Sequence, residues 1–197
     1  RHILEDQHIE KLSGLAKDYA QFFLDARDDI TTKFVEFDES LLNSQRIRIH
    51  GDLHLGQILA SENNDFYIID FEGEPESTIR DRKVKQTPLK DVAGVLRSFH
   101  YAVYAVIFDK KFKSTLSETD LFAAGEKYYQ CVLSVFLRTY LDTAMSSNMD
   151  VGYYPEIVYL LKYHLLEKAV YEIGYELKSR PDWAIIPLTG IKQILGN

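Results

Sequence analysis

The chain has 197 residues, 46% hydrophobic and 27% charged, which is enough for a folded domain with a substantial core. Its formal net charge of −7 argues against a general nucleic-acid-binding protein, because phosphate-backbone affinity comes from clustered lysine and arginine. No apolar run approaches the ~18 residues of a membrane span, and the single cysteine cannot form an intramolecular disulfide. We therefore expect a cytoplasmic protein with no membrane partner, and a buried Cys131.

The N-terminal part is predicted to begin with one long helix. Apolar residues recur at three- and four-residue steps through 2–30, and 31–45 reads as a short helical piece with a connection. Alternation then predicts short strands at 46–49, 57–60 and 66–70. The last two form a hairpin around the turn 61–65.

The C-terminal part is predicted to be mostly helical. A polar loop over 72–87 precedes a helix from Pro88 to about Phe108, with Thr87 as its N-cap. Further helices are expected over 117–140, from Pro155 to about Leu177, and from Pro187. The expected fold class is α+β, mostly helical.

Polar side chains gather where the predicted strands end. His50, Asp52, His54 and Gln57 lie on one loop, and Asp70 ends the strand at 66–70. One hypothesis is a His/Asp metal site of a hydrolase, although no second ligand-spaced cluster exists to complete it. The other is a pair of carboxylates, Asp52 and Asp70, serving Mg²⁺ and a phosphate chain. The purely structural alternative is that these acids only cap turns.

The spacing of these residues resembles a known catalytic pattern. His50-Gly-Asp52-x-x-x-x-Gln57 is similar to the protein-kinase motif H-R-D-L-x-x-x-N, with Asp70-Phe71-Glu72 in the place of D-F-G. HGD in place of HRD is typical of aminoglycoside-phosphotransferase-like small-molecule kinases. Four longer strings together resemble maltokinases, which use ATP to make maltose 1-phosphate: HGDLHLGQIL, IIDFEGEP, PLKDVAGVLRSFHYA and EKAVYEIGYELKSRPDWAIIPL.

The resemblance implies that 1–197 is a single C-terminal lobe of a protein-kinase-like fold. It would hold a catalytic loop at 50–57, a metal-binding strand end at 70–72 and a helical subdomain at 88–197. The sequence lacks a G-x-G-x-x-G loop and a V-A-I-K lysine. We therefore expect the chain's own N-terminal nucleotide-binding lobe to precede Arg1, and this piece alone to be inactive.

The resemblance also implies roles for particular residues. Asp52 would be the catalytic base and His50 would orient the loop. Gln57 and Asp70 would bind Mg²⁺ beside ATP, and Asp91 would support the catalytic loop from its helix.

Substrate-binding candidates are spread along the chain. The aromatic spacing on the predicted helix 155–177 also suits a sugar-stacking face, although such a stripe is more often core packing. Trp183 is expected to be a packing anchor. The candidates are His54, Glu72, Arg97, Glu167, Tyr171, Tyr175 and Arg180.

The expected activity is ATP-dependent phosphorylation of maltose, with possible fusion to or association with a trehalose synthase. Two alternatives stay open. One is a kinase for another sugar or aminosugar, and the other is a pseudokinase-type binding module that performs no chemistry.

Overall fold

A computed structural model describes residues 12, 14–38, 42–74, 78–109 and 113–196. These residues fall into two compact units. Unit 1 comprises 1–42 and 158–197, and unit 2 comprises 43–157, so that the boundary lies inside one helix. None of the helices in the described ranges is both long and apolar enough to cross a membrane.

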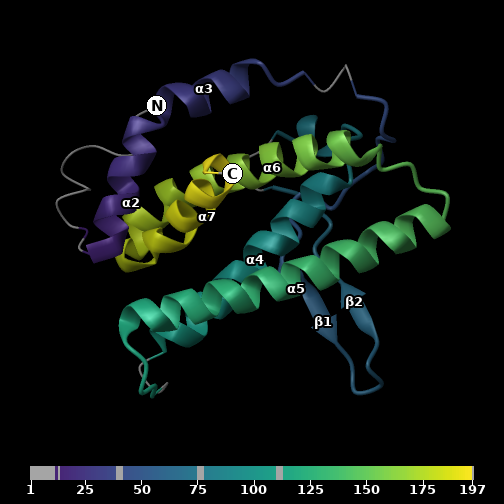
Figure 1. Ribbon diagram of the computed structural model, residues 1–197. Coiled ribbons are helices and arrows are strands. Elements are labelled where there is room, and N and C mark those ends of the chain that lie inside the picture. Colours follow the sequence, from purple (N-terminus) through teal and green to yellow (C-terminus); the bar gives the residue numbers. More distant parts are fainter. Residues whose placement is uncertain (1–11, 13, 39–41, 75–77, 110–112, 197) are drawn as a thin grey trace. The chain divides into compact units, whose positions relative to one another are not determined.

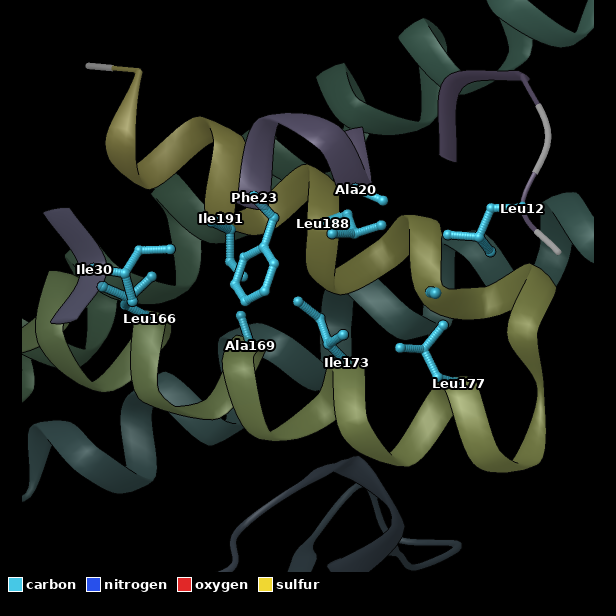
Figure 2. Close-up of a cluster of buried hydrophobic side chains, with 11 residues drawn as sticks. Leu12, Ala20, Phe23, Ile30, Leu166, Ala169, Ile173, Leu177, Leu188 and Ile191 are labelled. Carbon is cyan, nitrogen blue, oxygen red and sulfur yellow. The ribbon is translucent and has the colours of Figure 1, made fainter. Parts of the chain in front are cut away.

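Unit 1 is built from helices around an apolar core. It holds α2 (Gly14–Asp25), α3 (Arg27–Val35), most of α6 (Tyr154–Ser179), the 3₁₀ turn η4 (Pro181–Ala184) and α7 (Ile185–Leu195). Helix α2 packs on α7. Figure 2 shows the buried side chains between these helices: Leu12, Ala20, Phe23, Ile30, Leu166, Ala169, Ile173, Leu177, Leu188 and Ile191.

The prediction of one continuous helix over 2–30 is wrong in its described part, and residues 1–11 and 13 lie outside that part. The chain forms two helices separated at Ala26, and the second continues to Val35. Asp28 and Asp29 lie in the first turn of α3, where carboxylates favour the start of a new helix. The apolar period continues across the break, so the pattern alone did not reveal it.

Unit 2 begins with a small antiparallel hairpin, β1 (Ile58–Ala60) and β2 (Phe66–Ile68), which confirms the predicted hairpin. Ile58 pairs with Ile68, and Asn64 takes a left-handed φ of 61° in the turn. The single-turn helices η2 (Leu55–Gln57) and η3 (Asp81–Lys83) flank the hairpin in sequence.

The strand predicted at 46–49 is wrong, because only an isolated bridge between Ile47 and Gln86 forms there. The partner segment runs directly into Thr87 and Pro88. In the antiparallel register Pro88 would face Gln45, where it has no N–H to donate. On the other side, toward Ile49, the facing amide of Val84 donates to Asp81 O instead, so the ladder cannot extend in either direction.

Two long helices, α4 (Leu89–Phe108) and α5 (Glu118–Ser146), pack side by side in unit 2 (Figure 1). Thr87 Oγ1 accepts from Leu89 N at the start of α4, and Ser117 Oγ accepts from Asp120 N at the start of α5. Helix α5 runs six residues beyond the predicted end at Tyr140. Cys131 lies exposed on this helix, so the expectation that it is buried is wrong.

Candidate active site

The predicted catalytic loop follows the buried residue Ile49 and leads through η2 into β1. His50 is buried at 5% exposure, whereas Asp52 and Gln57 are half-buried. The loop has a left-handed residue, Gly51, at φ 87°. A side chain there would meet the backbone of Gly73, whose Cα lies 3.3 Å from the position of an added Cβ. The two glycines allow the loop and the segment after β2 to lie in contact.

Helix α4 holds the loop through the carboxylate of Asp91. Its Oδ2 accepts a hydrogen bond from His50 N at 2.7 Å, and its Oδ1 accepts one from Gly51 N at 2.8 Å. Burial raises the pKa of Asp91, against the opposing effect of these two backbone donors. Both oxygens of one helix residue thus fix consecutive peptide groups of the loop.

His50 connects the loop to the end of β2. Its Nε2–H donates to Ile69 O at 2.8 Å, and its Nδ1 faces the backbone N of Asp52 at 3.4 Å. The ring also lies 4.9 Å from the ring of Phe71. One imidazole therefore contacts the backbone of Asp52 and the backbone of the residue before Asp70.

Gln57 and Asp70 lie side by side at the base of the hairpin. Ile69 N donates to Gln57 O at 3.0 Å, and Gln57 Nε2 donates to Asp70 Oδ2 at 2.9 Å. Asp70 is exposed and has a left-handed φ of 63°, a strained conformation for a residue with a side chain. The pair presents an amide oxygen and a carboxylate, which are hard donors suited to Mg²⁺.

This donor set fits a magnesium ion shared with a bound phosphate chain, because such sites use only one or two protein carboxylates. It does not resemble a self-contained metal centre. Among the described residues, no group of three or more His, Cys, Asp or Glu side chains is placed to hold a metal ion.

Two candidates close to the loop have local structural contacts. His54 Nδ1 accepts from Gly56 N at 3.1 Å and thereby caps η2. Glu72 is exposed, and its backbone oxygen lies 3.5 Å from Arg82 Nη1. Their substrate-binding roles stay predictions.

Arg97 lies in the interior of unit 2 and is only 2% exposed. Its Nη1 donates to His100 Nδ1 at 2.8 Å. His100 Nε2–H in turn donates to Glu126 Oε1 at 2.6 Å, which also accepts from Tyr104 OH at 2.9 Å. Arg97 therefore belongs to a buried network between α4 and α5, and its substrate-binding role stays a prediction.

The remaining candidates, on and after α6, belong to unit 1. Arg180 forms a two-pronged ion pair with the buried Glu176, at 3.0 and 2.7 Å, and lies over the ring of Trp183. Glu167 Oε2 lies 3.1 Å from His164 Nδ1. Tyr171 and Tyr175 are exposed. These residues lie in unit 1, whereas the loop 50–57 lies in unit 2, and their sugar-binding role stays a prediction.

Two residues that the sequence motifs do not indicate contact the loop from α4. Gly94 lies against Leu53 O, and Ser98 Oγ accepts from Leu55 N at 3.0 Å. Their spacing from Asp91, three and seven residues, places all three on one helix face. That recurrence of small and polar residues along one face of the helix was the available signal.

No family model matches the chain. In sequence it is 25% identical over 166 residues to a glucosamine kinase from Streptacidiphilus jiangxiensis, covering 84% of this chain and 35% of the relative. It is 28% identical over 148 residues to a glucosamine kinase from Mycolicibacterium smegmatis, covering 74% of this chain and 34% of the relative. The chain thus spans about a third of the length of the curated relatives it matches.

Solved structures of glucosamine kinase share the fold. One crystal form superposes with a TM-score of 0.72 at 21% identity, over 97% of this chain and 44% of that chain. A complex with glucosamine, ADP and inorganic phosphate superposes with a TM-score of 0.67 at 20% identity, again over 97% of this chain and 44% of that chain. The mostly helical fold with a two-stranded sheet is therefore one found in small-molecule kinases.

Proposed function

We propose that the chain is the catalytic part of an ATP-dependent kinase that phosphorylates a hydroxyl group of an aminosugar. The observation that carries this proposal is the joint placement of Asp52, Gln57 and Asp70 by His50 and the hairpin. The named relatives are glucosamine kinases, and one solved neighbour holds glucosamine, ADP and phosphate. The comparisons thus favour the aminosugar alternative over maltose, for which they offer no support.

In the proposed reaction, Asp52 accepts the proton of the attacking sugar hydroxyl. His50 holds the backbone at Asp52 and at the residue before Asp70, so that the base and the phosphate-binding end keep a fixed separation. Gln57 and Asp70 would hold Mg²⁺, which supplies charge neutralisation for the phosphate chain. Orientation and electrostatics would thus account for most of the catalysis, as is general for phosphoryl transfer.

We propose that the nucleotide-binding elements lie in an N-terminal lobe that covers the hairpin. The hairpin exposes large apolar side chains, with Phe66 72% and Tyr67 59% exposed, beside Leu59 at 50%. Large apolar side chains exposed in this way on both faces of a short hairpin indicate an interaction surface. The proposed activity is that of the whole protein, since the chain spans only a third of its relatives.

The proposal is tested in the intact protein with MgATP and a panel of glucosamine, N-acetylglucosamine, glucose and maltose. We expect glucosamine to have the highest kcat/KM, and Asp52→Asn to lower kcat by roughly 10²–10⁴-fold without lowering the melting temperature. Asp65→Asn is the matched control, because Asp65 is an exposed acid in the hairpin turn. Near-normal turnover by Asp52→Asn would contradict the assignment. Preferred turnover of maltose would mean that the acceptor is maltose and not an aminosugar. Binding of Mg-nucleotide without phosphate transfer would favour the pseudokinase alternative.

A further inference from the structure

Helix α4 contacts the catalytic loop at two points beyond the Asp91 carboxylate. At Gly94, an added Cβ would lie 2.5 Å from Leu53 O, far closer than real Cβ atoms approach an oxygen. At Ser98, the hydroxyl accepts from Leu55 N at 3.0 Å while donating to Val95 O at 3.1 Å. The loop backbone on both sides of Asp52 is therefore seated on one face of this helix.

The three helix residues act on the loop in different ways. Asp91 attracts the backbone at His50 and Gly51, and Ser98 attracts it at Leu55. Gly94 lies between them and contributes only the absence of a side chain. These hydrogen bonds can all form at once because Gly94 has no side chain to hold the loop away from the helix.

We propose that Gly94 and Ser98 are positioning residues for Asp52, which set the distance between the loop backbone and α4. The kinetic part of this inference rests on the proposed kinase function, whereas the geometric part does not.

Substitution of Gly94 has a specific physical consequence. Its nearest neighbour is a backbone carbonyl, which cannot rotate away as a side chain can, so an alanine must displace the loop itself. A displacement approaching 1 Å at the reacting group is enough to cost about 10²-fold in rate. Residues that bind nucleotide outside the loop are not displaced, so the loss should fall on kcat more than on the KM for ATP.

Gly125 provides a matched control on the neighbouring helix α5. It is also a helical glycine of unit 2, but an added Cβ there meets the ends of two side chains, Ile107 Cδ1 at 2.8 Å and Val103 Cγ1 at 3.1 Å. Both glycine-to-alanine changes gain the same intrinsic helix propensity. They differ in whether a loop backbone or a flexible side chain has to move.

The kinetic experiment compares Gly94→Ala, Ser98→Ala, Ser98→Thr and Gly125→Ala in the intact protein. We expect Gly94→Ala to lower kcat by about 10²-fold and Ser98→Ala to lower it by a smaller factor. Ser98→Thr keeps the hydroxyl acceptor and should restore most of the loss, and Gly125→Ala should keep wild-type kcat. A Gly94→Ala variant with wild-type kcat would overturn the proposal, as would an equal loss in both glycine variants.

Hydrogen–deuterium exchange supplies a readout that does not require activity. We expect Gly94→Ala and Ser98→Ala to increase deuterium uptake in the peptide covering 50–57, with no increase in Gly125→Ala. Unchanged uptake in both α4 variants would overturn the positioning role. If the intact protein phosphorylates none of the tested sugars, the proposed function fails, and the uptake comparison still decides whether Gly94 and Ser98 position the loop.

Discussion

In unit 1, helices α2, α6 and α7 meet through side chains that carry no polar atoms, whereas in unit 2 the loop 50–57 is attached to α4 through backbone amides and oxygen acceptors. Apolar packing is non-directional and tolerates changes that conserve volume. Hydrogen bonds to backbone amides fix both distance and direction. The difference suggests that contacts in unit 1 mainly determine stability, and that contacts beneath the loop mainly determine where Asp52 lies.

The largest expected effect on stability comes from the core of unit 1. Ile173 is fully buried, so Ile173→Ala should lower the free energy of unfolding by about 2–5 kcal/mol, and Ile173→Val by about 0.5–1.5 kcal/mol. Urea unfolding measures both variants. Deuterium uptake at 50–57 should remain at the wild-type level under native conditions. Faster exchange in that loop would mean that the core of unit 1 also controls the geometry of the candidate site.

A smaller loss of stability, with a larger loss of activity, is expected for Asp91→Asn. The amide keeps one acceptor oxygen but turns an NH₂ group toward either His50 N or Gly51 N, leaving one backbone donor without its partner. The cost should be about 1–3 kcal/mol in the free energy of unfolding, with kcat lowered by about 10²-fold through displacement of the loop. Urea unfolding and steady-state kinetics of the intact protein measure the two effects.

Asp142→Asn is the control for this change, because Asp142 is exposed on α5 and only faces Arg138 at 3.8 Å. Its effect on stability should be small. If Asp91→Asn loses stability while the loop exchanges deuterium at the wild-type rate, the carboxylate is a packing element like Ile173, and the comparison between the two units fails.

The sequence was most informative where local chemistry decides the structure. The hairpin around Asn64 and the helix start at Ser117 follow from turn and cap preferences, and the structure has both. The strand at 46–49 failed because its pairing depends on a segment 39 residues away, around Gln86, whose flanking positions Val84 and Pro88 offer no N–H to the ladder. A pattern within four residues carries no information about that partner.

The candidate site shows the same limit. The loop residues were found through their motif spacing, but the motif says nothing of what lies beneath them. The contacts of Gly94 and Ser98 with the loop depend on how α4 packs against it, which the motif does not specify. The surroundings of Arg97 were equally hidden from the sequence, since its burial beside His100 depends on how α4 and α5 pack.

The smallest expected effect concerns pH and the buried network between α4 and α5. His100 is fully buried, and burial lowers its pKa, although the hydrogen bond to Glu126 opposes the shift and Arg97 adds to it. The rings of Tyr104 and Tyr129 complete its surroundings. Because the unfolded chain binds a proton on this residue at a higher pH than the folded chain does, the folded state should lose stability as the pH falls below about 6.5.

His100→Gln tests this expectation, since glutamine can still donate to Glu126 and accept from Arg97 but does not titrate. Unfolding free energies measured at pH 7.5, 6.5 and 5.5 should decline more steeply in the wild type than in the variant. Equal slopes would mean that His100 titrates alike in the folded and unfolded states, despite its burial. A steeper decline confined to the wild type would show that the folded state requires neutral His100, so that α4 carries a residue that controls stability as well as the residues that position the loop.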